Sequence, residues 1–304
     1  MGVDYEHLHP SVRALAAKND AERIFWVNSY RWFSYPKSMS VLDRLNFIYD
    51  YPQRNRMPNV LIHGTSGMGK TTIALKFKAL HAPETNNDST DRQPVVFMDA
   101  PEMPELGDLY YELLKGLGVP PILCDRPFKQ RKRMALNILQ KVKTRVLLID
   151  DIHNLLAGTY RQQRQFMNGL RYFSNVSSIS LVCIGTVDAL LAVASDDQLA
   201  NRFEEIELRP WKNDHEFKSL IASILRSLPL RKPTNIDERG FLSKAFSLGE
   251  GKTGRIFKLM ESAANMAIAT QKEQIDLSIL NSPDLILPVV ASHGIRHRVR
   301  RSRT

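Results

Sequence analysis

Short apolar segments alternate with amphipathic ones over the first two-thirds of the chain. Each apolar segment is nearly continuous, a pattern typical of strands that are covered on both faces of a parallel sheet. Between them, hydrophobic residues recur at helical spacing, as Met134, Ile138 and Leu139 do within residues 129–142. This alternation favours an α/β fold with right-handed crossovers. The predicted strands cover residues 59–63, 94–99, 145–150, 178–185 and 203–208.

The pattern changes after Trp211, where strand-like segments stop. Residues 213–228, 236–248 and 253–271 have helical spacing, and a further helix is compatible with residues 274–280. A small all-helical domain of this length is within the usual range. We therefore predict four regions: a lead-in at 1–55, an α/β domain at 56–210, a helical lid at 211–285 and a basic tail at 286–304.

Composition indicates an ordinary globular protein, with 43% hydrophobic and 24% charged residues. No apolar run approaches the ~20 residues that a membrane span needs, and the N-terminal segment lacks the apolar core of a secretory signal. The two cysteines, Cys124 and Cys183, do not make a disulfide framework. We expect a cytoplasmic protein that has no membrane partner.

The net charge of +10 is concentrated in two places. The last twelve residues hold five arginines and no acid, and a second basic cluster covers residues 126–133. Basic segments of this kind commonly bind nucleic acid, and a solvated tail is the alternative interpretation.

Residues 64–71, GTSGMGKT, match the phosphate-binding pattern G-x-x-x-x-G-K-[ST] in full. They stand between the predicted strand 59–63 and a helical segment at 71–80, where this loop is required to be. Its glycines let backbone N–H groups face a phosphate, while Lys70 reaches the β- and γ-phosphates and Thr71 offers a hydroxyl to Mg²⁺. The predicted ATP-binding residues are Gly64, Thr65, Ser66, Gly67, Met68, Gly69, Lys70, Thr71 and Thr72.

Two aspartates end the predicted strand 145–150. Asp150 suits a Walker B carboxylate that holds Mg²⁺ together with Thr71. Asp151 is placed to orient or deprotonate the attacking water. Glu is usual at this second position, and Asp has oxygens that fall back by ~1.5 Å, so we expect slow hydrolysis. A helix N-cap is the alternative role for Asp151.

Three further residues complete the predicted hydrolysis site. Thr186 ends a strand and is placed to hydrogen-bond the γ-phosphate or the water. Arg202 precedes the fifth strand, from which an arginine can reach the γ-phosphate of a neighbouring subunit. Arg255 begins a helix of the predicted lid and can sense the γ-phosphate of its own subunit, with Lys252 as a competitor. A simple strand-end threonine and a solvated surface arginine are the alternatives for Thr186 and Arg202.

Taken together, these motifs resemble the AAA+ ATPases. Four segments, 31–39, 56–72, 147–175 and 185–211, resemble more narrowly the TniB/TnsC group of transposition ATPases. The resemblance implies a parallel five-stranded AAA+ sheet with helices on both faces, plus a helical lid. Asp151 departs from the glutamate that the group usually has.

What the resemblance implies about function is an ATP- and Mg²⁺-dependent protein that assembles on double-stranded DNA as a ring or helical filament. It would connect a TniQ-like target selector to an integrase-like transposase. In such assemblies the loops after the second strand line the DNA channel. Residues 100–108 contain no lysine or arginine, so the channel cations are expected to be Arg126, Lys129, Arg131, Lys132 and Arg133. Such contacts predict sequence-tolerant, salt-sensitive binding.

Three other functions remain compatible with the sequence. A replicative helicase loader or origin-binding ATPase shares every ATP motif. A P-loop kinase would need neither an arginine from a neighbour nor a basic tail. The departure at Asp151 also keeps open an ATP-gated scaffold that does not hydrolyse its nucleotide.

Overall fold

The computed structural model describes residues 5–85, 91–194 and 200–287, and the chain divides into two compact units. An α/β unit comprises residues 34–209, and a helical unit combines the residues up to 33 with those from 210 onward. The predicted lead-in, 1–55, is therefore divided between the two units. Of the predicted basic tail, 286–304, all but the first two residues lie outside the described part of the chain.

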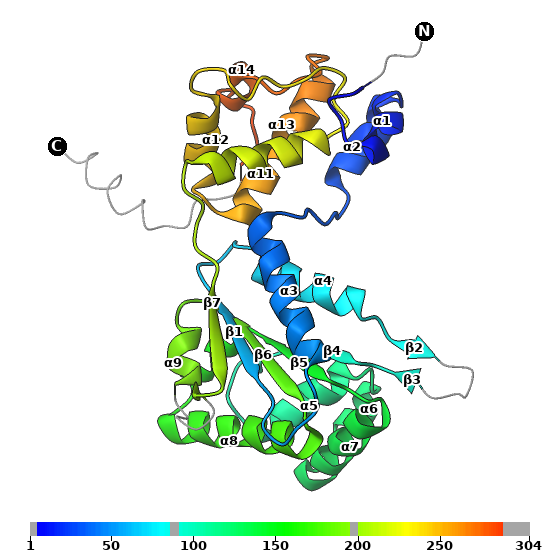
Figure 1. Ribbon diagram of the computed structural model, residues 1–304, viewed down its shortest axis with the longest axis vertical. Coiled ribbons are helices and arrows are strands. Elements are labelled where there is room, and N and C mark those ends of the chain that lie inside the picture. The colour runs from blue at the N-terminus through cyan, green and yellow to red at the C-terminus, as the bar shows by residue number, and fades with distance from the viewer. Residues whose placement is uncertain (1–4, 86–90, 195–199, 288–304) are drawn as a thin grey trace, which may run out of the picture. The chain divides into compact units, whose positions relative to one another are not determined.

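Five parallel strands form the sheet of the α/β unit (Figure 1). Their order is β4-β5-β6-β1-β7, and each lies within two residues of its predicted bounds. Because β1 lies between β6 and β7, the loop after β1 follows an interior strand. Open α/β folds bind ligands beyond the carboxyl ends of such strands. The strands are β1 (Asn59–His63), β4 (Val95–Asp99), β5 (Val146–Asp150), β6 (Ser180–Gly185) and β7 (Phe203–Glu207).

Helices cover both faces of this sheet, as Figure 1 shows. One face carries α3 (Pro36–Asp50) and α4 (Lys70–Leu80), and the other carries α5 (Leu106–Gly116), α7 (Phe128–Lys141), α8 (Tyr160–Ser177) and α9 (Ala189–Val193). Shorter elements are α6 (Pro121–Cys124), the 3₁₀ helix η1 (Ile152–Ala157) and a hairpin of β2 (Glu84–Thr85) and β3 (Asp91–Arg92). The predicted AAA+-like layering of helix, sheet and helix is confirmed.

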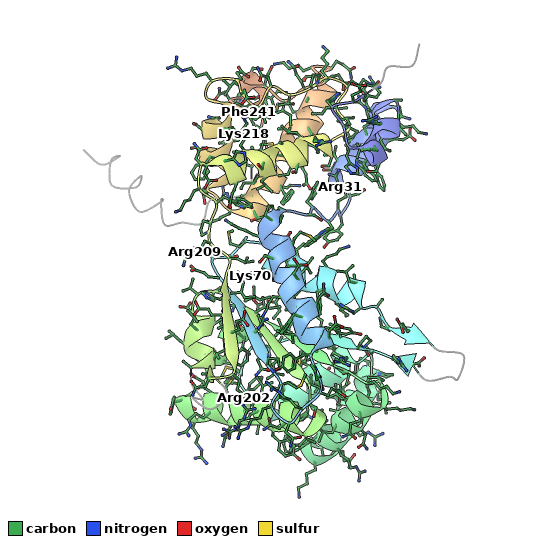
Figure 2. All side chains as sticks on the ribbon, in the orientation of Figure 1. Arg31, Lys70, Arg202, Arg209, Lys218 and Phe241 are labelled. Carbon is green, nitrogen blue, oxygen red and sulfur yellow. The ribbon has the colours of Figure 1, made fainter. Side chains whose placement is uncertain are left out.

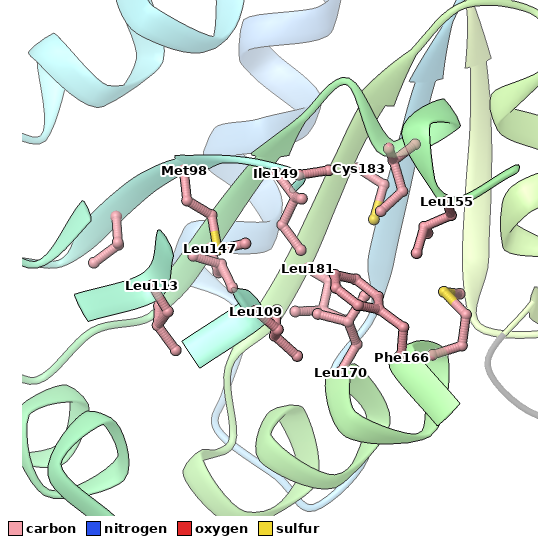
Figure 3. Packing of buried hydrophobic residues seen from close by; sticks show 14 of the residues in the cluster. Met98, Leu109, Leu113, Leu147, Ile149, Leu155, Phe166, Leu170, Leu181 and Cys183 are labelled. Carbon is pink, nitrogen blue, oxygen red and sulfur yellow. The ribbon is translucent and has the colours of Figure 1, made fainter. Parts of the chain in front are cut away.

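The hydrophobic core explains why these segments form a layered sheet. Alternate strand residues such as Met98, Ile149 and Cys183 face α5 and α8, where Leu109 and Phe166 meet them (Figure 3). All of these side chains are buried, and each of them except the smaller Cys183 contributes about 1.5–3 kcal/mol of transfer free energy. In β1, β5 and β6 the intervening residues are also buried, which accounts for the continuous apolar runs of these three strands. The edge strand β7 is instead largely exposed.

The helical spacing predicted within residues 129–142 is confirmed, because α7 begins at Phe128. The channel loop that the family resemblance implies for the basic cluster is wrong for four of its five cations, which lie on the first turns of α7: Lys129, Arg131, Lys132 and Arg133. Only Arg126 precedes the helix. The reason is packing: helical spacing from Phe128 onward places Ala135 and Leu139 in the core, and Pro127 sets the N-terminal boundary.

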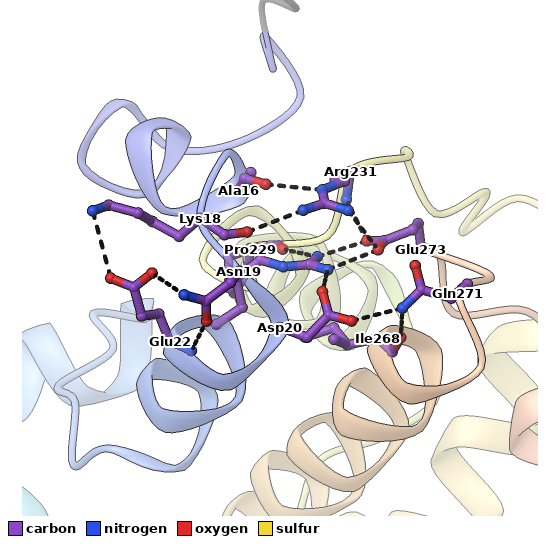
Figure 4. Close-up of polar contacts among 11 residues, drawn as sticks. Ala16, Lys18, Asn19, Asp20, Glu22, Pro229, Arg231, Ile268, Gln271 and Glu273 are labelled. Atoms are coloured by element: carbon purple, nitrogen blue, oxygen red, sulfur yellow. Dashed lines mark hydrogen bonds and ion pairs between the residues drawn. The ribbon is translucent and has the colours of Figure 1, made fainter.

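The helical unit contains the helices predicted after Trp211, namely α11 (His215–Arg226), α12 (Phe241–Gly249), α13 (Thr253–Ala269) and α14 (Leu277–Leu280). It also contains α1 (Pro10–Ala16) and α2 (Asp20–Asn28), which the sequence did not predict. The guanidinium of Arg23, fully buried, donates to both carboxylate oxygens of Glu273 at 2.7 and 2.8 Å (Figure 4). This pair fixes α2 to the segment that follows α13.

None of the helices in the described ranges has both the length and the hydropathy that a bilayer crossing requires.

Candidate nucleotide-binding site

The loop between β1 and α4 has a backbone that favours glycine at its two ends. Gly64 has a φ of 146°, and a Cβ there would lie 2.4 Å from the main-chain oxygen of Leu208. Gly69 is the N-cap of α4 in the left-handed region, with φ 83°. The loop thus turns tightly into α4, whose first N–H groups are free of intrahelical partners and suit an anion.

Lys70 is the first residue of α4, and its side chain folds back over the loop. Its Nζ donates to the main-chain oxygens of Gly64 at 2.8 Å and Thr65 at 2.9 Å. The side chain is buried, and burial lowers its pKa, while the charges of Asp150 and Asp151 oppose that shift. The ammonium group is therefore held at the mouth of the loop.

Thr71 and Asp150 meet where β5 ends beside the loop. The Thr71 hydroxyl donates to Asp150 Oδ2 at 2.5 Å, and Asp150 Oδ1 accepts from the Asp151 N–H at 2.8 Å. Burial raises the pKa of Asp150 above its ordinary value, against the hydrogen bond from Thr71. A hydroxyl and a carboxylate that converge in this way are the hard oxygen ligands that Mg²⁺ prefers, so these residues fit that ion.

Asp151 has an unusual backbone conformation. Its φ of 51° and ψ of 36° lie in the left-handed region, which a residue other than glycine adopts at a cost of about 1–2 kcal/mol. Its side chain is 59% exposed and makes no capping hydrogen bond to η1, so the N-cap interpretation has no support. Strained residues of this kind concentrate at functional sites.

Thr186 follows β6, the strand next to β1. Its hydroxyl is buried and has no hydrogen-bond partner among the described residues. A buried hydroxyl without a partner is costly unless a ligand uses it.

His153, which the sequence analysis did not single out, lies between Asp151 and the end of β6. Its Nδ1 is 3.9 Å from Asp151 Oδ1 and would be 3.3 Å from a Cβ at Gly185.

Arg202 is not brought together with the loop of its own chain. Its main-chain oxygen accepts from Asn59 N–H at 3.1 Å, which places it where β1 begins, whereas the loop follows the end of β1. Its Nη1 donates to Asn175 Oδ1 at 2.8 Å. Arg255 belongs to the helical unit, where its Nη1 lies 3.5 Å from Glu250 Oε1, and its role at the nucleotide stays a prediction.

The five residues predicted to bind DNA differ in exposure. Arg126, Lys129 and Arg133 are exposed. Arg131 is half-buried and its guanidinium packs near Gly107, at the start of α5. Lys132 lies with its Nζ 3.9 Å from the ring centroid of Tyr172 on α8. The exposed three are the better candidates for phosphate contact.

The strand order, the glycine loop at β1 and the paired aspartates at β5 define the AAA+ P-loop ATPase fold. The sequence matches the bacterial TniB protein family over residues 23–213, more than half of the chain, and the protein belongs to that family. No curated protein matches the chain in sequence.

Solved structures of origin-recognition proteins have the same fold. The Aeropyrum pernix ORC2 protein in its ADPNP–ADP complexes superposes with a TM-score of 0.61 at 14% identity, over 89% of this chain and 73% of that one. CDC6P from Pyrobaculum aerophilum superposes with a TM-score of 0.56 at 14% identity, over 82% of this chain and 67% of that one. Drosophila ORC bound to DNA superposes with a TM-score of 0.53 at 14% identity, over 87% of this chain and 65% of that one. At this identity the similarity establishes the fold alone.

Proposed function

We propose that this protein is a cytoplasmic ATPase that regulates transposition by assembling on double-stranded DNA. In this proposal it forms a ring or helical filament and links a TniQ-like target selector to an integrase-like transposase. Slow ATP hydrolysis then resets the assembly. Membership of the TniB family supports the transposition setting. Similar structures of the same fold that hold nucleotide or DNA are consistent with both ligands.

The contact between Thr71 and Asp150 is the observation that carries the nucleotide part of this proposal. It joins the residue after the Walker A lysine to the end of the Walker B strand, 79 positions apart. On nucleotide binding, Lys70 Nζ exchanges its two carbonyl partners for phosphate oxygens. Thr71 and Asp150 would hold Mg²⁺, which supplies charge neutralisation of the β- and γ-phosphates.

Asp151 is the proposed general base. Its exposed carboxylate accepts a hydrogen bond from the attacking water and takes the proton as the water oxygen bonds to the γ-phosphorus. The bond between that phosphorus and the β–γ bridging oxygen breaks in the same displacement, and the bridging oxygen leaves with ADP. Thr186, with its unpartnered hydroxyl, orients that water or the γ-phosphate. Because Asp is one methylene shorter than Glu, a misplacement of ~1 Å lowers the rate by about 100-fold, hence slow hydrolysis.

Arg202 is the proposed contribution of a neighbouring subunit. Its position at the opposite end of β1 from the loop supports action between chains rather than within one. Turnover would then require a head-to-tail assembly in which each loop faces the Arg202 of the next subunit. Hydrolysis is thereby restricted to the assembled state.

A role in replication is the second candidate, as a helicase loader or origin-binding ATPase. The observation in its favour is the similarity to ORC and CDC6P structures. That similarity concerns the fold, whereas the family match favours transposition. Capture of a purified transposase or of a replicative helicase by the DNA-bound protein separates the two.

The proposed function is tested by sedimentation of the protein with duplex DNA in ATP, in ADP and without nucleotide, together with phosphate release with and without DNA. We expect assembly in ATP alone and hydrolysis that DNA stimulates. Equal co-sedimentation in all three conditions would contradict ATP-controlled assembly. Phosphorylation of a small molecule instead of DNA-stimulated hydrolysis would indicate a kinase.

A further inference from the structure

The charge of the α/β unit is strongly segregated along the sequence. Between residues 126 and 187 the only acids are Asp150 and Asp151, whereas the same stretch holds eleven lysines and arginines. The two aspartates end β5 inside the candidate nucleotide site. The remainder of the stretch, which builds α7 and α8, therefore has no acidic residue of its own to offset its positive charge.

The fold places these two helices beside each other. Lys132 of α7 lies 3.9 Å from the ring centroid of Tyr172 on α8, and both helices bury their apolar faces in one core. Four of their cations, Lys129, Arg133, Arg161 and Arg164, are exposed to solvent. In Figure 2, many nitrogen-tipped side chains project from this part of the α/β unit, away from the sheet.

The outer face of α8 carries cations at helical spacing. Arg161 and Arg164 are exposed, and Arg171 lies ten residues after Arg161, which corresponds to ~15 Å along the helix. The guanidinium of Arg164 lies 5.7 Å from the ring centroid of Tyr160, which is itself 64% exposed. This stacking limits the positions that the arginine samples before any ligand arrives.

The exposed cations of both helices lack acidic partners. Within the described ranges, no carboxylate lies at ion-pair distance from Lys129, Arg133, Arg161 or Arg164. Elsewhere in the protein, exposed cations such as Lys218, Lys115 and Lys18 pair with nearby acids. These four exposed cations of α7 and α8 thus differ from such paired cations in having no acidic partner within the described ranges.

We propose that the face formed by Lys129, Arg133, Arg161 and Arg164 binds the phosphate backbone of duplex DNA, with α8 contributing as much as α7. The proposal rests on the proposed function, in which the protein assembles on DNA, and extends the binding surface to a helix outside the basic cluster at 126–133. A duplex presents one negative charge per ~1.7 Å of helix axis, which suits exposed cations that have no acidic partner. Arginine donates two parallel hydrogen bonds to phosphate, so Arg161 and Arg164 position the protein without reading bases.

The test compares DNA affinity against salt concentration for wild type and three double variants in ATP. Arg161→Gln/Arg164→Gln removes two cations from α8, and Arg161→Lys/Arg164→Lys keeps the charge. Arg226→Gln/Arg239→Gln makes the same charge change at two exposed arginines of the helical unit. ATP affinity, measured in parallel, verifies that each variant is folded.

We expect the glutamine variant on α8 to flatten the log–log salt dependence by ~1.8, since each phosphate contact contributes ~0.9. If the phosphate contacts contribute nothing to DNA affinity at 1 M salt, the DNA affinity of the glutamine variant at 0.1 M salt is about 60-fold below that of wild type. The lysine variant should keep the wild-type slope, and the control should lose less than ~threefold, because its charges lie outside the proposed face.

Each other outcome overturns a defined part of the account. An α8 glutamine variant with the wild-type slope refutes the α8 surface and leaves the proposed function intact. Equal losses for the lysine and glutamine variants indicate a packing defect instead of phosphate neutralisation. Unchanged DNA binding with loss of transposase capture assigns the face to an acidic protein. A wild-type protein that binds no duplex refutes the proposed function as well.

Discussion

Arg202 provides the sharpest test, because its position distinguishes catalysis within one chain from catalysis between two chains. It adjoins Asn59 at the start of β1, while the phosphate loop begins after His63, four residues along the strand. At a rise of ~3.3 Å per residue these ends are ~13 Å apart, and the hydrogen bond to Asn175 holds the side chain at its own end. We therefore expect Arg202 to serve the nucleotide of a neighbour.

The size of the effect follows from the charge that develops on the γ-phosphate. Removing one donor to such a charge lowers kcat by about 100- to 1000-fold, or ~2.7–4 kcal/mol. Arg202→Ala should therefore bind ATP normally and turn over at least ~100-fold more slowly. Asp150→Ala should also be inactive, but it still carries Arg202. In an equal mixture, about a quarter of head-to-tail interfaces combine an intact loop with an intact Arg202.

The assay is steady-state phosphate release on saturating duplex DNA, with each variant alone and in mixtures at constant total protein. We expect the mixture to recover up to about a quarter of wild-type turnover, which is far above either variant alone. Arg226→Ala, a variant at an exposed arginine of the helical unit, is the matched control and should retain wild-type activity. Absence of recovery, together with normal turnover by an isolated monomer, would refute the reasoning.

Three further predictions concern the site and the helical unit. Asp151→Asn should bind ATP normally and prolong DNA-bound assemblies, and Asp151→Glu should hydrolyse faster if side-chain reach limits the rate; a faster Asp151→Asn enzyme would exclude Asp151 as the base. Gly64→Ala forces a Cβ to within 2.4 Å of the main-chain oxygen of Leu208, so ATP affinity in a fluorescence titration should fall by about tenfold to a hundredfold. An unchanged affinity would show that this loop does not bind the phosphates. Glu273→Gln leaves the buried Arg23 without its buried counter-charge and should lower the free energy of unfolding in urea at pH 7 by ~3–5 kcal/mol. Asp20→Asn, at the half-exposed partner of the same arginine, should cost far less. Burial alone would raise the pKa of Glu273, but hydrogen bonds from Arg23 and from the Arg231 N–H hold it below the ordinary 4.5, so its contribution to stability is present above pH 4.5 and is lost as the pH falls through the lowered pKa.

The sheet and the phosphate loop were predictable because their signals are local. Continuous apolar runs such as 146–150 leave few options besides a strand covered on both faces. The pattern at 64–71 requires a strand before it and a helix after it, and both are present as β1 and α4. Fold class and the identity of the loop therefore follow from short stretches read in order.

Features that depend on distant residues were not predictable. The pairing of Arg23 with Glu273 joins positions 250 apart, and nothing near Arg23 indicates that α2 belongs to the helical unit. Likewise, the left-handed backbone of Asp151 and the unpartnered hydroxyl of Thr186 are properties of the folded site, and neither can be recognised from the residue types in the sequence.

The central claim, that ATP held by this loop controls assembly on DNA, is tested most directly by Lys70→Ala. Its Nζ donates to both Gly64 and Thr65 in the loop, and the substitution removes this cation from the phosphate site. We expect ATP-dependent binding to a labelled duplex, followed by fluorescence anisotropy, to be lost in Lys70→Ala and retained in Lys78→Ala, which alters a later lysine of α4. If Lys70→Ala still forms ATP-dependent complexes with wild-type affinity, the loop does not control assembly and the account is wrong.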